Sequence, residues 1–272
     1  MLNALTNVPV HYLFPGGRSK AVTLSYDDGA VDDRQLVAIF NRYGLKSTFH
    51  INSGGLDKGN RIAADEVKGL YAGHEVACHF YNHPFIDRVP PAKIIHEILA
   101  DRLKLESIVN YPVRGLSYSM GMHNQTAREI AAMLGIAYSR TTFSGRQWTL
   151  PENWLAWNPT CRHADDDFLP MAEKFIAGKH PFSLFYAWGH SFEFERLNNW
   201  KIIESFSEMM QATTASIWFA TNIEIFDYVE ALQRLRFSAD CSMVFNPSVL
   251  SVWLEVGDNS LELPAGKLTC TN

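Results

Sequence analysis

The stretch that decides the fold is Ala21-Val22-Thr23-Leu24-Ser25-Tyr26-Asp27-Asp28-Gly29. A β-rich, mostly apolar run ends here in two aspartates and a glycine, which is typical of a buried strand that leaves a sheet through a tight turn. An amphipathic pattern follows and stops at Gly44, where a C-terminal helix cap belongs. Strand, polar turn and helix in this order predict the first unit of a parallel α/β fold.

The same unit recurs along most of the chain. Strand-like runs alternate with helical patterns, and we predict seven strands, at residues 21–26, 47–52, 75–79, 113–116, 136–140, 183–188 and 216–220. Seven units within residues 1–237 suit a distorted (β/α)7 barrel better than an open sheet, although periodicity alone leaves the open sheet as the alternative. We therefore expect an α/β catalytic domain over residues 1–237.

Two segments depart from this alternation. Residues 142–167 form a long stretch without a clear period, which indicates a functional loop because structureless loops of this length are uncommon. Residues 238–272 contain short strand-like runs separated by Asn-Pro, Gly-Asp-Asn and Pro-Ala-Gly turns. We interpret this last segment as a small β-rich C-terminal appendage with exposed strand edges, which would allow a homo-oligomer.

The composition excludes several classes of protein. The 272 residues are 47% hydrophobic and 19% charged, which excludes a disordered chain, and the net charge of −5 disfavours nucleic acid as a partner. No apolar run is long enough to span a membrane, and the first residues do not resemble a signal peptide. Four widely spaced cysteines without a Cys-x-x-Cys pair suit a reducing compartment. We expect a cytoplasmic protein, with a secreted protein trimmed of its leader as the alternative.

Acidic and imidazole side chains follow two of the predicted strands. Asp27 and Asp28 end the first strand, and His79 and His83 come at the end of the third. The carboxyl ends of parallel strands meet at one mouth of a barrel, so these side chains are expected to lie close together. Two adjacent carboxylates can take different roles, one binding a cation and the other accepting a proton. An Asp, His, His set leaves an open coordination position, as in a catalytic zinc site, and the same atoms suit non-haem iron.

The order of these motifs resembles the polysaccharide deacetylase family, carbohydrate esterase family 4. The resemblance covers residues 20–235 and depends on LSYDDG at 24–29, STFHIN at 47–52 and GHEVACHFYNHP at 73–84. It implies a distorted barrel of parallel strands with Asp27 as general base. It further implies that Asp28, His79 and His83 bind a divalent metal, Zn²⁺ first, with Co²⁺, Ni²⁺ or Mn²⁺ as alternatives.

The later family motifs match less closely. The third motif corresponds loosely to residues 114–118, which implies that Arg114 orients Asp27 and that the backbone N–H of Tyr118, or of Ser117, contributes to an oxyanion hole. The fifth motif corresponds to residues 185–190, which implies that His190 is the general acid.

The fourth motif, an aspartate that tunes this histidine, has no secure match. The candidates for its role are Asp165, Asp166, Asp167 and Arg140.

Aromatic residues are candidates for contacts with a sugar ring. The loop after the fifth strand carries Trp148, Trp154 and Trp157 together with Phe143, and Trp188 comes just before His190. We expect the substrate-binding residues to be Trp148, Trp154, Trp157, Trp188 and Arg140.

The resemblance implies removal of N-acetyl groups from an acetylated carbohydrate. In this reaction metal-bound water attacks the acetyl carbonyl. The alternatives are an O-acetyl ester or a cyclic amide such as a ureide or imide, or a non-catalytic carbohydrate-binding relative. The expected partner is an acetylated sugar, and no nucleic acid or membrane is expected.

Overall fold

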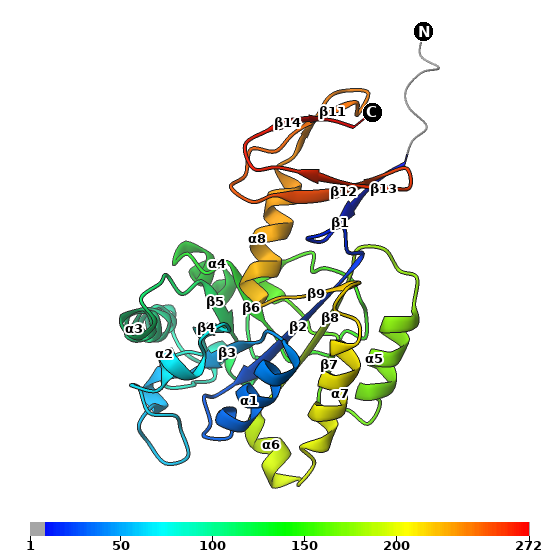
Figure 1. Cartoon of the computed structure of the whole chain (residues 1–272). Helices are drawn as coiled ribbons and strands as arrows, with labels where there is room; N and C mark the ends of the chain where they lie inside the picture. The colour runs from blue at the N-terminus through cyan, green and yellow to red at the C-terminus, as the bar shows by residue number, and fades with distance from the viewer. Residues whose placement is uncertain (1–8, 272) are drawn as a thin grey trace.

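The computed structural model describes residues 9–271 and is built around one curled parallel sheet (Figure 1). The strand order is β6-β5-β4-β3-β2-β8-β7, and β9 also pairs with β2. The strands are β2 (Lys20–Asp27), β3 (Thr48–Ile51), β4 (Glu75–Cys78), β5 (Gly115–Ser117), β6 (Tyr138–Arg140), β7 (Cys161–Arg162), β8 (Ser183–Gly189) and β9 (Ile217–Phe219).

Helices connect these strands and cover the outside of the sheet (Figure 1). They are α1 (Asp33–Tyr43), α2 (Val67–Leu70), α3 (Pro91–Val109), α4 (Gln125–Met133), α5 (Phe168–Ala177), α6 (Ser191–Arg196), α7 (Lys201–Gln211) and α8 (Asn222–Gln233). Short 3₁₀ helices are η1 (Ser53–Gly55), η2 (Ile86–Arg88), η3 (Ser119–Gly121) and η4 (Trp154–Ala156). Helix α1 ends at Gly44, whose φ of 69° suits glycine. None of the helices within residues 9–271 has the length and apolarity needed to cross a membrane.

The predicted fold class is confirmed, with one strand more than expected. All seven predicted strands are present, and β7 lies inside the segment predicted to be a loop. This two-residue strand is too short to produce a pattern in the sequence. Together with a parallel bridge between Arg140 and Trp157, it links β6 to β8 and curls the sheet toward closure.

Two small antiparallel sheets lie beyond the C-terminal end of α8 (Figure 1). One contains β1 (Val10–Leu13), β12 (Val252–Val256) and β13 (Asn259–Leu263), and the other contains β10 (Arg236–Phe237), β11 (Met243–Phe245) and β14 (Leu268–Cys270). Strand β1 is not among the predicted strands, and although it lies within the expected catalytic domain of residues 1–237, it pairs with β12. Both ends of the described chain therefore build this part, and the division at residue 237 stays a prediction.

The alternation of side chains along β2 places a polar row inside the barrel. Val22, Leu24 and Tyr26 pack in the larger hydrophobic cluster. The residues between them, Thr23 and Ser25, make buried side-chain hydrogen bonds to Asn222 and Tyr186. Asp27 continues the polar row at the carboxyl end of the strand, because successive side chains of a strand point to opposite faces.

Candidate active site

A cavity of about 600 Å³ opens at the carboxyl ends of β2, β4 and β8. The parallel strands all end at this mouth, so the side chains that follow them converge there. The cavity is lined by Asp27, Asp28, His79, His83, Met120, Thr142, Ser144, Arg162, Asp165, Trp188, His190 and Phe192.

Asp28, His79 and His83 form a compact group of metal-ligand type. Their ligand atoms all lie within 4.8 Å of one another. Asp28 Oδ1 is 3.8 Å from His79 Nε2 and 3.9 Å from His83 Nε2, and it is buried without a hydrogen-bond partner. Asp28 and His83 both have positive φ, 84° and 55°. Non-glycine residues rarely adopt this conformation, which is concentrated at functional sites.

His79 is held in the orientation that a metal ligand needs. Its Nδ1 lies 3.0 Å from the carbonyl oxygen of Ser117 and 2.6 Å from Ser117 Oγ, so Nε2 faces Asp28. Burial lowers the pKa of His79 to about 4, which favours the neutral imidazole that coordinates metals. A carbonyl acceptor on the far ring nitrogen is the usual support of a metal-bound histidine. With the unpartnered Asp28 Oδ1, this arrangement fits a divalent cation.

Asp27 is adjacent to this group but has different partners. Its carboxylate pairs with the buried guanidinium of Arg140 and accepts a hydrogen bond of 3.2 Å from Ser117 Oγ. His50 Nδ1 and His79 Nε2 lie 3.5 Å and 3.8 Å from its oxygens. Burial alone would raise the pKa of Asp27, but Arg140 and the two histidines hold it well below the ordinary value. Asp27 is therefore ionised at neutral pH and fixed in place.

The structure corrects the roles expected of Arg114 and Tyr118. Arg114 precedes β5, so it lies at the opposite end of the strand from the cavity and pairs there with Asp227 at 2.5 Å. Arg140 ends the neighbouring strand β6 and occupies the position beside Asp27. The N–H of Tyr118 donates to the carbonyl of Arg140 at 3.0 Å, so it is committed to the sheet.

His190 has a carboxylate partner that the sequence did not identify. Its Nδ1 lies 3.4 Å from Glu193 Oε1, at the start of α6, and its side chain lines the cavity. Glu193 also contacts His163, Nε2 to Oε2 at 3.2 Å, and pairs with Arg162. Burial would raise the pKa of Glu193, but the neighbouring imidazoles hold it below its ordinary value. The spacing in the sequence could have predicted this contact, because a glutamate three residues after a histidine lies on the same side of a helical turn.

His163 is packed tightly behind this carboxylate. Its ring stacks between Tyr26 and Phe194, with centroid distances of 5.5 Å and 4.1 Å. A Cβ at Gly189 would lie 1.9 Å from His163 Nδ1, so glycine is required at this position. The buried imidazole thus fixes the position of Glu193.

The aspartates proposed as tuning residues have other partners. Asp165 accepts a hydrogen bond of 3.0 Å from the backbone N–H of Arg162, and Asp167 pairs with Arg146 at 2.5 Å. Asp166 is exposed. Arg140 is engaged with Asp27, and the carboxylate beside His190 is that of Glu193.

The tryptophans are divided between the cavity and the core. Trp188 lines the cavity, with the guanidinium of Arg140 4.3 Å from its ring centroid. Trp148, Trp154 and Trp157 do not line it, which corrects the expectation of a stacking wall. Trp157 is buried between strands, and Trp154 packs edge-on against it at 4.9 Å. Trp157 is in the core and the partly buried Trp154 packs against it, because Trp157 pairs with β6 and the residues after it pair with β8.

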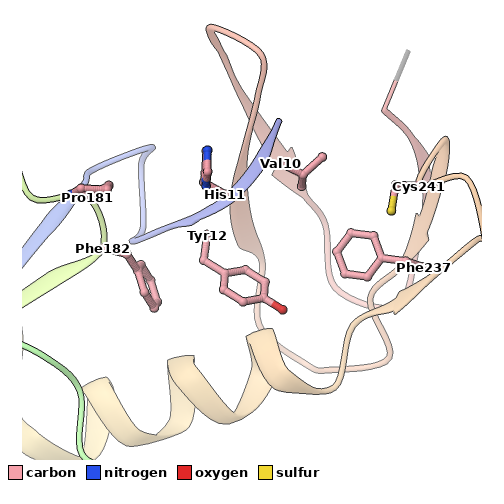
Figure 2. A pocket seen from close by; sticks show the side chains of 7 residues that line it. All are labelled: Val10, His11, Tyr12, Pro181, Phe182, Phe237 and Cys241. Carbon is pink, nitrogen blue, oxygen red and sulfur yellow. The ribbon is translucent and has the colours of Figure 1, made fainter. Parts of the chain in front are cut away.

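Another cavity, of about 490 Å³, lies between the barrel and the small sheets (Figure 2). Figure 2 shows its mostly apolar lining, which includes Tyr12, Phe182 and Phe237. It contains none of the acidic or histidine residues of the β2 and β4 ends. The candidate site is therefore the cavity at the carboxyl ends of the strands.

Comparison with known proteins agrees with this architecture. The family model described as polysaccharide deacetylase matches residues 15–139. A putative polysaccharide deacetylase from Mycobacterium smegmatis shares 14% identity at a TM-score of 0.63, covering 83% of this chain and 95% of that one. No protein of curated function matches.

Other similar structures include a pseudoenzyme and a deacetylase bound to acetate. A carbohydrate esterase family 4 pseudoenzyme from Bacillus anthracis shares 16% identity at a TM-score of 0.50, covering 76% of this chain and 66% of that one. A Streptococcus pyogenes deacetylase in complex with acetate shares 22% identity at a TM-score of 0.47, covering 49% of this chain and 61% of that one. The chain thus spans less than two thirds of either relative. The family model, which covers just under half of the chain, and the shared fold nevertheless confirm the resemblance to the polysaccharide deacetylase family that the motifs carry.

Proposed function

We propose that this protein is a metal-dependent hydrolase that removes N-acetyl groups from an acetylated sugar, oligosaccharide or polysaccharide. The observation that carries the proposal is the separation of two carboxylates. Asp28 belongs to a set of three metal-ligand side chains, whereas Asp27 is excluded from it by its ion pair with Arg140. Such a pair can divide cation binding from proton transfer.

A divalent ion held by Asp28, His79 and His83 would lower the pKa of a water molecule and polarise the acetyl carbonyl. Asp27 accepts the proton of the attacking water, because its carboxylate is ionised and lies beside the ligand group. One of its oxygens is 3.8 Å from Nε2 of His79, a member of that group. Arg140 and Ser117 hold both oxygens of Asp27, so the base does not rotate away from the cavity.

His190 donates a proton to the departing amine on the opposite side of the cavity. Cleavage of an amide needs this proton, since a bare amide anion is a poor leaving group. Glu193 Oε1 lies 3.4 Å from His190 Nδ1, which leaves Nε2 as the atom that can reach the substrate. His190 as proton donor, with Glu193 beside it, supports an amide as the bond that is broken, because an amide needs a proton on its leaving group.

Acetate release tests the proposal. Protein stripped with a chelator and then given Zn²⁺, Co²⁺, Ni²⁺ or Mn²⁺ should release acetate from N-acetylglucosamine oligomers, and the stripped protein should not. Acetate from O-acetylated sugars alone would favour the ester reaction. Stripped protein that retains full activity would contradict metal dependence, and metal-loaded protein without activity on either substrate would indicate a pseudoenzyme.

A further inference from the structure

The loop that carries His79 and His83 contains strained backbone. It begins where β4 ends, and two of its residues, Phe80 and His83, have positive φ of 60° and 55°. This conformation is unfavourable for a residue with a side chain, so it persists where the surrounding structure enforces it. Contacts from outside the loop must therefore hold its shape.

Helix α3 packs beside β4 and supplies these contacts. The backbone N–H of His79 donates to Asp101 Oδ2 at 2.9 Å, and that of Asn82 donates to Glu97 Oε2 at 2.6 Å. The N–H of Tyr81 donates to the carbonyl oxygen of Glu97 at 3.2 Å. Three N–H groups of the loop thus have partners on two helix residues that lie one turn apart.

Both carboxylates are fully buried, at 0% exposure, and each has contacts through both oxygens. Asp101 Oδ1 accepts from the N–H of Ser53 at 2.7 Å, so this side chain joins the end of β4 to the start of η1. Glu97 Oε1 accepts from Asn82 Nδ2 at 2.8 Å and lies 2.7 Å from Lys93 Nζ. Neither carboxylate lines the candidate active-site cavity, so both act on the loop and not on a ligand.

The sheet holds only the beginning of the loop. The N–H of His79 also donates to the carbonyl oxygen of Ile51 on β3, at 3.1 Å. The N–H groups of Tyr81 and Asn82 come after β4 has ended at Cys78, and both donate to α3. The path of the loop beyond the sheet therefore depends on the helix.

We infer that Asp101 and Glu97 are positioning residues that hold His79 and His83 at the spacing that a metal ion needs. The inference rests on the proposed metal-dependent function and identifies the element that prepares the metal site. The two imidazole rings lie 4.6 Å apart between centroids. Without the carboxylates the strained residues would relax and the rings would separate, so metal binding would have to restore the loop and would weaken.

The two positions differ in how they tolerate an amide side chain. Asp101 accepts from two backbone N–H groups, and the NH₂ of an asparagine there would meet one of them donor to donor. Glu97 faces the side-chain amide of Asn82 as well as its N–H. A glutamine there keeps both contacts when the Asn82 amide turns over. Asp101→Asn should therefore disturb the loop more than Glu97→Gln.

Cobalt binding to metal-stripped protein tests the inference. Co²⁺ affinity is measured by isothermal titration calorimetry, and visible absorption reports the coordination of the bound ion. Asp101→Asn and Glu97→Ala should bind Co²⁺ about 10–100-fold more weakly than wild type, the usual effect of losing a group that supports a metal ligand. Glu97→Gln should remain close to wild type. The matched control is Glu75→Gln, a buried carboxylate at the other end of β4, which should keep the wild-type affinity and spectrum.

The outcomes separate this inference from a folding defect and from the proposed function. Circular dichroism and chemical denaturation show which variants fold, and if Asp101→Asn does not, Glu97→Ala measured against Glu97→Gln decides. Wild-type affinity in the folded variants, or equal weakening in Glu75→Gln, overturns the inference while metal dependence stands. If the wild type binds Co²⁺ but releases no acetate, the deacetylase function fails and the affinity ratios still decide the inference. If the wild type binds no Co²⁺, both fail.

Discussion

Glu193 shows how one buried carboxylate can organise one side of the site. It is 4% exposed on its side chain and contacts His190, His163 and Arg162. The other ring neighbours of His190 are Trp188 and Phe192, which are aromatic and offer no carboxylate to its Nδ1. Without Glu193 the imidazole would therefore be free to rotate. The proposed acid therefore depends on a residue that need not touch the substrate.

Glu193→Gln should lower kcat for N-acetylated oligosaccharides by about a hundredfold, the scale of a general-acid contribution. Hydrolysis of 4-nitrophenyl acetate should fall by less than about threefold, since its leaving group departs without a proton. Glu195→Gln, an exposed neighbour on α6, is the control and should affect neither reaction. Equal losses on both substrates would show that Glu193 supports the fold and not the acid.

The helix α8 illustrates how an element is fixed by the barrel interior. Its first residue, Asn222, is buried, and Thr23 Oγ1 donates to its Oδ1 at 2.8 Å while its Nδ2 donates to Tyr186. Its backbone N–H donates to Thr48 Oγ1 at 2.9 Å. The start of the helix thus satisfies polar groups from three strands.

Asn222→Ala should lower the free energy of unfolding by about 2–4 kcal/mol, because it removes two buried side-chain hydrogen bonds and leaves the Thr23 hydroxyl without its partner. Chemical denaturation measures the change, and exposed Asn259→Ala should change stability by less than about 0.5 kcal/mol. A loss at Asn222 no larger than that of the control would disprove this role of the interior contacts.

Local patterns predicted the strands of the sheet and the end of the sheet at which four of the candidate site residues lie. Asp27, Asp28, His79 and His83 could be found because each follows a strand, and parallel strands end at one mouth. The same rule could have separated Arg140, at the end of a strand, from Arg114, which precedes one.

The burial of the loop tryptophans could not be predicted in this way. Trp157 is buried because it pairs with Arg140 of β6 across the intervening segment. Such pairing leaves no periodic signal. Two partners of Glu193, Arg162 and His163, are also distant from it in the sequence.

At the scale of the whole molecule, buried carboxyl groups link stability to pH. Glu75 is 6% exposed and accepts hydrogen bonds from Thr48 Oγ1, Tyr138 OH and the N–H of Ile223. Burial raises its pKa from 4.5 to about 7. Between these values the folded state holds a proton that the unfolded state has lost, so this group's contribution to stability falls as the pH rises.

Glu75→Gln should remove this dependence. Relative to wild type, its free energy of unfolding should improve by roughly 3 kcal/mol between pH 4.5 and pH 7.5. Comparing variant with wild type cancels the contributions of the other titrating groups. Denaturation curves across this range provide the measurement, with exposed Glu173→Gln as the control. A difference that stays constant with pH would show that Glu75 does not titrate in this window.

The central claim is that Asp27 and Asp28 have separate tasks, and it is tested most directly by measuring bound metal and acetate release on the same samples of Asp27→Asn and Asp28→Asn. Asp27→Asn should bind metal like the wild type and lose acetate release by at least about a hundredfold, whereas Asp28→Asn should lose the metal as well. Asp27→Asn with wild-type acetate release, or Asp28→Asn with undiminished metal, would contradict the account.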